Sequence, residues 1–281
     1  MRYLRGFHCV IVALLLVALS LPGFALPVAG PRPLRPPNKR VTPATSTNWA
    51  GFAVTGTVGS VSHVKGSWIV PSVVSCSPGE NSFSSFWVGI DGYASNTVEQ
   101  IGTDSDCSKG TPTYFAWWEF YPEKYYVINS PTPIPGHAFS AEVSYNPTTD
   151  AFTASITDTT TGKTFSTTFQ DKYHAERSSA EWITEGPLNK PLTHFTTSGF
   201  NPAGSAFYGS DYTSIASTNC ATISGFIGVT GCSPIGAYNS ASPSSVYEIT
   251  MISKKGATRA SHSALSTAGT SFYVTWVSAA P

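Results

Sequence analysis

The sequence predicts an all-β domain, a two-sheet antiparallel β-sandwich with very little helix. From Asn48 onward, short runs of alternating polarity are separated by Gly, Pro, Ser and Asn, and the runs recur about every ten residues. No repeat of about 20 to 50 residues is visible, which argues against a propeller or a solenoid. Hydrophobic residues make up 41% of the chain and charged residues only 11%, which favours a packed core over disorder. These observations together favour a jelly-roll or concanavalin-like sandwich.

Several runs alternate apolar and polar residues clearly enough to predict strands. They cover residues 64–70, 83–90, 113–121, 138–145, 151–157, 164–169 and 272–277. A turn is expected at 158–162, and the one segment compatible with a short helical turn is 172–180. Residues 199–245 are rich in Gly, Ser and Asn, and we interpret them as a long insertion in the same domain.

The first 25 residues have the pattern of a secretory signal peptide. Arg2 and Arg5 precede an apolar run at 10–21, and a small-x-small motif follows at 23–25. The apolar run is too short to cross a bilayer core of about 30 Å, so we expect export rather than membrane insertion. The mature protein is therefore expected to be secreted and extracellular.

Residues 26–45 are Pro-rich and basic, and they lack the periodicity of a helix or a central strand. Two interpretations stay open. The segment is either a linker or the cationic pro-segment of a zymogen, which covers an acidic cleft until processing near Lys39 and Arg40. A single domain is expected over residues 46–281, and a monomer is the default expectation.

The formal net charge of zero hides an asymmetry between the amino end and the body of the chain. Six of the 16 basic residues precede residue 41, so residues 41–281 carry 10 basic and 16 acidic residues, a net charge of −6. A nucleic-acid-binding domain is disfavoured, because binding to phosphates requires clustered Lys and Arg.

An even number of cysteines lies outside the signal peptide, as expected for disulfides formed in an oxidising compartment. They are Cys76, Cys107, Cys220 and Cys232. Four cysteines allow three pairings, and the short spacings favour Cys76 with Cys107 and Cys220 with Cys232. Neither a C-x-x-C nor an H-E-x-x-H motif occurs, so we expect no metal site and no cofactor.

The carboxylates are the most informative candidates for chemistry. A G-x-S-x-G motif is absent, and nothing in the sequence brings a histidine beside a serine and an acid. Residues two apart on a strand share a face, so Glu119 is expected beside aromatic rings in the run 117–121. Glu185 shares a face with Glu181 and precedes a Gly-Pro turn, at a strand end where a cleft rim would lie. Such strands are more often plain sandwich core, but an acidic, aromatic sheet face is also typical of proteins that bind extended peptides or glycans.

Five segments together resemble one family, the glutamic peptidases or eqolisins. The strings are STNWAGF at 46–52, FWVGIDGY at 86–93, VEQIGTD at 98–104, AWWEFYPE at 116–123 and AEWITEGP at 180–187. They occur in the family order with similar spacing, over roughly residues 46 to 187. The resemblance implies a β-sandwich of two seven-stranded sheets and a secreted acid endopeptidase that acts on polypeptides.

The resemblance also implies roles for individual residues. The catalytic glutamine corresponds to Gln100, and the catalytic glutamate corresponds to Glu185 and not to Glu181. Six further positions correspond to cleft residues that bind substrate: Trp87, Asp91, Asp104, Trp117, Glu119 and Tyr121. Phe115 departs from the pattern, because some relatives carry an acid there. The cysteine positions also differ, so the family disulfides are not transferred.

The chemistry of a Glu and Gln pair is consistent with peptide hydrolysis in acid. A carboxylate with a pKa near its ordinary value of about 4.3 stays partly ionised at low pH and can deprotonate a water, whereas a histidine cannot. The amide of Gln100 can donate to the developing oxyanion without titrating. The alternative is a glycan-active sandwich, either a lectin-like binder or a glycoside hydrolase that uses two carboxylates among Glu99, Glu119 and Glu185.

Overall fold

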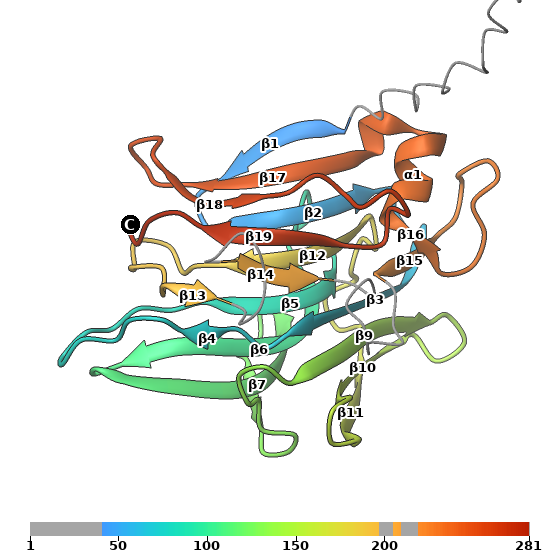
Figure 1. Ribbon diagram of the computed structural model, residues 1–281. Coiled ribbons are helices and arrows are strands. Elements are labelled where there is room, and N and C mark those ends of the chain that lie inside the picture. Colours follow the sequence, from blue (N-terminus) through green and yellow to red (C-terminus); the bar gives the residue numbers. More distant parts are fainter. Residues whose placement is uncertain (1–40, 197–204, 209–218, 281) are drawn as a thin grey trace, which may run out of the picture. The chain divides into compact units, whose positions relative to one another are not determined.

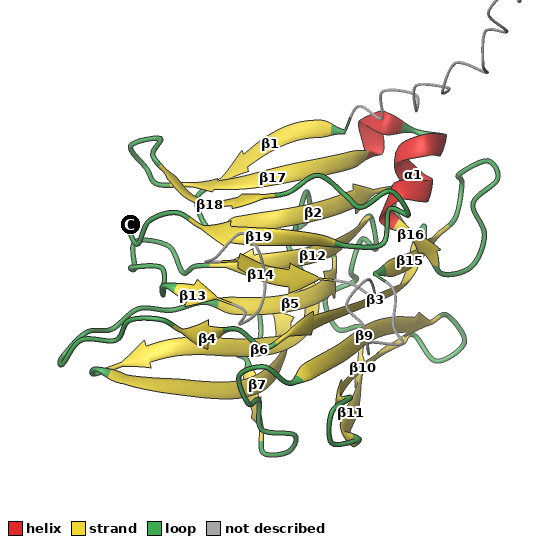
Figure 2. Cartoon of the chain, viewed as in Figure 1, coloured by secondary structure: helices red, strands yellow, loops and turns green. Residues whose placement is uncertain are grey.

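The computed structural model describes residues 41–196, 205–208 and 219–280, which all belong to one compact unit, Lys39–Pro281. The all-β prediction is confirmed. In the described part of the chain the helical elements are α1 (Ile235–Ala241) and the 3-10 turn η1 (Pro243–Ser245). Figure 2 shows these two elements in red at one end of the yellow strands. The proposed signal peptide at 1–25 lies outside the described residues.

One layer of the sandwich contains eight strands. Every neighbouring pair runs antiparallel, except the first strand, which lies parallel to its neighbour at the edge. In spatial order they are β1 (Thr42–Ser46), β17 (Val246–Ile252), β2 (Trp49–Thr55), β12 (Ser179–Glu185), β5 (Ser85–Ile90), β6 (Val98–Ser108), β7 (Thr111–Tyr121) and β8 (Tyr126–Ile128). Because β1 begins at Thr42, the folded domain starts a few residues before the boundary expected at 46.

The second layer contains nine of the described strands (Figure 1). They are β11 (Lys163–Gln170), β10 (Ala151–Asp158), β9 (Ala138–Asn146), β3 (Val61–Ile69), β15 (Cys220–Ile223), β16 (Ser233–Pro234), β14 (Ser205–Tyr208), β19 (Phe272–Trp276) and β18 (Thr258–His262). Pairing of β17 with β18 joins the two layers into one hydrogen-bonded set. A separate two-stranded sheet pairs β4 (Ser72–Val73) with β13 (Phe195–Thr196). Both layers are therefore wider than the seven strands that the resemblance implied.

The main core lies between the layers, and Trp182 of β12 is at its centre. Its ring is fully buried, and its Nε1 donates to the Lys65 carbonyl at 2.8 Å. Gly66 leaves room for this ring, since a Cβ there would lie 2.8 Å from Trp182 Cδ1. A smaller apolar cluster covers the outer face of the first layer: Ala53, Trp87, Val98, Trp117, Ile183 and Ile249. This second cluster explains why β12 and β6 are buried on both faces and lack the alternation of a half-exposed strand.

The helical turn expected at 172–180 is wrong. The segment is irregular until β12 begins at Ser179, and His174 and Arg177 have positive φ. The carboxylate of Asp91 accepts the backbone N–H groups of Arg177 and Ser178 at 2.6 and 2.8 Å. A helix needs those N–H groups for carbonyls one turn earlier, so this pairing is incompatible with a helix.

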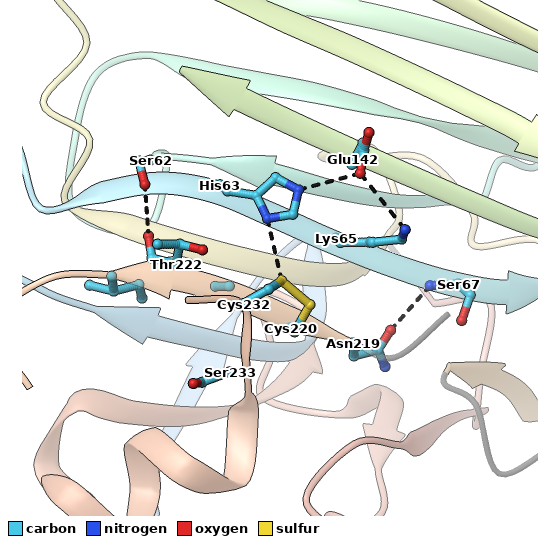
Figure 3. The surroundings of a disulfide bond; sticks show 12 residues. Ser62, His63, Lys65, Ser67, Glu142, Asn219, Cys220, Thr222, Cys232 and Ser233 are labelled. Carbon is cyan, nitrogen blue, oxygen red and sulfur yellow. Dashed lines mark hydrogen bonds and ion pairs between the residues drawn. A yellow bond between two sulfur atoms is a disulfide. The ribbon is translucent and has the colours of Figure 1, made fainter. Parts of the chain in front are cut away.

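Both expected disulfides are confirmed, Cys76 with Cys107 and Cys220 with Cys232. The second links β15 to the residue before β16, within the segment 199–245 interpreted as an insertion; residues 199–204 and 209–218 of that segment lie outside the described residues. Figure 3 shows His63 of β3 between this disulfide and β9. Its Nδ1 lies 3.3 Å from Cys232 Sγ and its Nε2 lies 3.3 Å from Glu142 Oε2.

Candidate active site

The register of four neighbouring strands brings the predicted site residues to the outer face of the first layer. Glu185 of β12 lies opposite Ser85 of β5, which lies opposite Asp104 of β6. Gln100 of β6 lies opposite Glu119 of β7. Residues an even number of positions apart share a face, so these polar side chains project to the same side of the sheet.

These side chains line a cavity of about 320 Å³. Its walls combine four acids with aromatic and small residues: Phe83, Ser85, Gln100, Asp104, Asp106, Phe115, Trp117, Glu119, Tyr125, Glu185 and Pro187. The cavity size is at the lower end of the range typical of ligand sites, about 300 to 1,000 Å³. Polar groups thus converge in one apolar-walled hollow.

Two glycines make room for Gln100, which lines this cavity, and for Trp87, which lies beside it. A Cβ on Gly102 would lie 2.6 Å from Trp87 Cβ, and a Cβ on Gly89 would lie 3.1 Å from Gln100 Cβ. The Trp87 Cβ thus lies beside Gly102, its partner across the β5 and β6 register, and the Trp87 indole reaches over Gly89, where a Cβ would lie 3.1 Å from Cζ3. Glycine at these positions lets a Trp and a Gln occupy adjacent strands without a clash.

Glu185 is held at both carboxylate oxygens. Asn48 Nδ2 donates to Oε1 at 2.9 Å, and Trp87 Nε1 donates to Oε2 at 3.0 Å. Trp49 packs edge-on against the Trp87 ring, with 5.1 Å between centroids. Burial raises the pKa of Glu185 to about 7, although the hydrogen bonds from Asn48 and Trp87 lower it. Glu185 therefore holds a proton over a wider pH range than an exposed glutamate.

Gln100 lines the same cavity from β6, which is separated from β12 by β5. It is 6% exposed, and its Nε2 donates to Glu119 Oε2 at 2.6 Å. Its Oε1 has no hydrogen-bond partner among the described residues. Burial raises the pKa of Glu119, and the hydrogen bond from Gln100 opposes that rise. The amide is thus oriented on one side and has unused hydrogen-bonding capacity on the other.

Two aspartates line the same cavity from β6, and Asp104 lies across β5 from Glu185. Trp117 Nε1 donates to Asp104 Oδ1 at 2.5 Å, and the Ser84 N–H donates to Asp106 Oδ1 at 2.9 Å. Burial raises the pKa of both carboxyls, that of Asp106 to about 7, and repulsion by Asp106 adds to the rise at Asp104. Asp106 was not predicted from the sequence as a site residue, although its spacing of two residues from Asp104 puts both side chains on one face.

Three residues predicted to bind substrate do not line the cavity. Asp91 is fully buried and its carboxylate holds the segment before β12, so it has a structural position. Tyr121 lies two residues after Glu119 on β7, on the same face of the strand. Its side chain is 50% exposed, and it is outside the cavity lining. Trp87 is not part of the cavity lining, but its Nε1 donates to Glu185, which is. Asn48 contacts Glu185 but was not predicted from the sequence as a site residue, because its position beside Glu185 depends on the pairing of β2 with β12.

Comparison with known proteins assigns the chain to a family. Residues 47–233 match the family described as Peptidase A4, which is more than half of the chain. The chain belongs to the Peptidase A4 family. The resemblance to glutamic peptidases is thereby confirmed, and the match extends beyond residue 187, into the segment interpreted as an insertion.

Two curated Peptidase A4 relatives are similar over part of their length. Aspergillopepsin-2 of Aspergillus niger is 29% identical over 160 residues, which are 50% of this chain and 56% of that protein. Scytalidopepsin B of Scytalidium lignicola is 31% identical over 142 residues, which are 50% of this chain and 51% of that protein. The chain thus spans about half the length of the curated relatives it matches.

Solved structures agree in fold. A scytalido-glutamic peptidase with a peptide-based transition state analogue has a TM-score of 0.60 and 22% identity, and the match covers 83% of this chain and 99% of that one. A complex of the same peptidase with a transition state analogue inhibitor has a TM-score of 0.58, 20% identity and the same coverage. These likenesses show the β-sandwich fold.

Features of other site classes are absent from the described part of the chain. No three His, Cys, Asp or Glu side chains come together there in a way that could hold a metal ion. The same residues include no helix long and apolar enough to span a membrane.

Proposed function

We propose that this chain is a secreted glutamic-type endopeptidase in which Glu185 activates a water and Gln100 stabilises the oxyanion. The observation that carries the proposal is that both side chains line one cavity and that each is oriented by its own hydrogen bonds. Membership of the Peptidase A4 family supports the reaction class.

Glu185 in its ionised form takes a proton from the attacking water. Asn48 and Trp87 donate to its two oxygens and fix the plane of the carboxylate. The remaining lone pairs accept the proton of the water, whose oxygen then forms a bond to the carbonyl carbon of the substrate. The carbonyl becomes an oxyanion and Glu185 becomes a neutral acid.

Gln100 is suited to the other half of this step. Its Nε2 carries two hydrogens, and the contact with Glu119 uses one of them. The second can donate to the oxyanion, and the unpartnered Oε1 can accept a hydrogen bond from the water. Because an amide does not titrate, this donor is present at every pH at which the protein folds.

The tetrahedral intermediate collapses when its nitrogen gains a proton. Protonated Glu185 supplies it, the carbon–nitrogen bond breaks, and the carboxylate is regenerated. The proton taken from the water is thereby returned to the leaving amine, and the reaction needs no group other than those of the cavity.

The proposed base sets the pH range in which turnover is expected. The free enzyme needs ionised Glu185, whose ordinary pKa of 4.5 is raised by burial to about 7. The acid limb of kcat/KM is therefore expected near pH 7, where it reports ionisation of the Glu185 carboxyl. This is higher than an exposed carboxylate would give.

The substrate is proposed to be a polypeptide. Phe83, Phe115 and Tyr125 provide apolar walls on either side of the acids, and they suit bulky apolar side chains. The solved scytalido-glutamic peptidase was crystallised with a peptide-based analogue, which supports the same substrate class here. We also propose that the protein is exported and acts as a monomer. The basic segment before residue 41 is proposed to cover the acidic cavity of the zymogen until it is cleaved.

The test is digestion of a denatured protein by the full chain between about pH 4 and 8, a range that spans the ionisation of Glu185 at about 7. Gln100→Ala and Glu185→Gln are each expected to abolish cleavage. Gln170→Ala on the exposed edge of β11 and Glu142→Gln on β9 are the matched controls and are expected to cleave normally. Full activity of either cavity variant would overturn the proposed dyad.

The same variants also distinguish peptide hydrolysis from the alternative, glycan hydrolysis. A glycoside hydrolase would cleave oligosaccharides and would not require the amide of Gln100. Cleavage of oligosaccharides by wild type and by Gln100→Ala, with no cleavage of peptides, would favour the alternative.

A further inference from the structure

The connection between β1 and β2 brings Ser46 and Asn48 to the proposed base. Trp49, the first residue of β2, lies opposite Glu185 in the register with β12. The pairing continues past the strand end, where the Gly186 N–H donates to the Asn48 carbonyl at 2.8 Å. The backbone of Asn48 is thereby fixed by the sheet, independently of its side chain.

Ser46 determines which way the Asn48 amide faces. The Ser46 Oγ accepts the backbone N–H groups of Asn48 and Trp49 at 3.3 and 3.1 Å. A serine hydroxyl has two acceptor lone pairs and one donor hydrogen, so its hydrogen is left for Asn48 Oδ1, which lies 2.9 Å away. With Oδ1 occupied by this donor, Nδ2 faces Glu185 Oε1 at 2.9 Å.

Donors on both sides of Glu185 have a consequence for the transferred proton. The Asn48 Nδ2 and the Trp87 Nε1 groups can donate but cannot accept. When Glu185 takes a proton from water, neither neighbour can accept a hydrogen bond from the new O–H group. The proton must therefore point toward the cavity, where the leaving nitrogen of the substrate would lie.

We propose that Asn48, oriented by Ser46, is a positioning residue for Glu185, fixing the carboxylate plane and directing its proton into the cavity. The inference rests on the proposed function, since it concerns how the base of that reaction is held. Asn48 acts through Glu185 and is not itself a catalytic residue. Ser46 acts one step further away, through the Asn48 amide.

The test compares pH profiles of kcat/KM for peptide cleavage by the full chain. Loss of the Asn48 donor removes a hydrogen bond to the ionised carboxylate, so Asn48→Ala is expected to move the acid limb up by about one pH unit. At pH values above the acid limb, kcat/KM of Asn48→Ala is expected to lie much closer to the wild-type value than at pH values below the limb. A purely structural role would reduce activity by the same factor at every pH, with the limb unmoved.

Ser46 provides a second, independent arm if Asn48→Ala folds poorly. Ser46→Ala is expected to move the acid limb in the same direction by less than Asn48→Ala, because Asn48 Oδ1 loses its donor while Nδ2 remains. Ser46→Thr keeps a hydroxyl and is expected to restore the wild-type limb. Asn146→Ala, which removes an exposed amide that accepts the Thr148 N–H, is the matched control with an unmoved limb.

The outcomes distinguish this inference from the proposed function. If Gln100→Ala and Glu185→Gln remain active, the proposed function fails. If those two variants are inactive but folded Asn48→Ala and Ser46→Ala keep the wild-type acid limb, the dyad stands and the positioning role is refuted.

Discussion

Replacing Asp106 with Asn should make the fold less sensitive to rising pH. Asp106 is 6% exposed, and burial raises its pKa from 3.8 to about 7. Between these values the folded protein keeps a proton that the unfolded chain releases. The free energy of unfolding therefore falls as pH rises from about 3.8 to about 7. Above about pH 7 the stability that comes from protonated Asp106 is fully lost.

The size of the effect follows from the shift. A difference of about three units, at about 1.4 kcal/mol per unit, gives up to about 4 kcal/mol lost at neutral pH. That is a large part of the roughly 5 to 15 kcal/mol that stabilises a typical domain. Asn cannot ionise, and its Oδ1 can still accept the Ser84 N–H, so Asp106→Asn should recover much of this loss. Because Asp106 raises the Asp104 pKa, the substitution should also ease ionisation of that neighbour.

Urea unfolding followed by tryptophan fluorescence at about pH 3.5 and pH 7 would measure the effect. We expect wild type and Asp106→Asn to be similar in acid, with the variant more stable by several kcal/mol at neutral pH. Asp150→Asn, in the exposed turn between β9 and β10, is the matched control and should change little at either pH. Equal stability of wild type and Asp106→Asn at pH 7 would refute the reasoning.

Three further substitutions or treatments test other parts of the structure. Glu142→Gln should act in the opposite direction, because the hydrogen bond from His63 lowers the Glu142 pKa; solvent screens this 43% exposed side chain, so the substitution should cost only about 0.5 kcal/mol at neutral pH and little below the folded pKa, measured by urea unfolding. Gly102→Ala should abolish peptide cleavage and lower the melting temperature by several degrees, because its Cβ would lie 2.6 Å from Trp87 Cβ; wild-type melting would contradict the packing argument. Removing the disulfide at Cys232 by Cys220→Ala with Cys232→Ala should destabilise the domain by about 3 kcal/mol, visible as a lower urea midpoint; an unchanged midpoint would contradict this.

Strands with one buried face were predictable from the sequence. The runs at 138–145 and 151–157 differ from β9 and β10 by one residue at the carboxyl end, because their side chains alternate between core and solvent. The helical turn at 172–180 was wrong because Asp91, far away in the sequence, takes its backbone N–H groups. A long-range hydrogen bond of this kind leaves no signal in local periodicity.

The candidate site was predictable in part. The rule that residues two apart share a face grouped Glu181 with Glu185 and Trp117 with Glu119, but it could not give the register that joins the strands. Gln100 was found only through the family resemblance, since a buried amide on a strand buried on both faces has no distinctive pattern. Asn48 and Asp106 were missed because their roles depend on which strand lies opposite.

The edge position of β1 links local fraying to the proposed chemistry (Figure 1). Among the described strands, β1 pairs only with β17, and its last residue is Ser46. Edge strands with a single neighbour open at lower free energy than the rest of a sheet. Peeling of this strand would withdraw the hydroxyl that orients Asn48 while the sandwich stays folded. On heating, peptide cleavage should therefore decline in an earlier phase than global melting, as the ladder between β1 and β17 opens first.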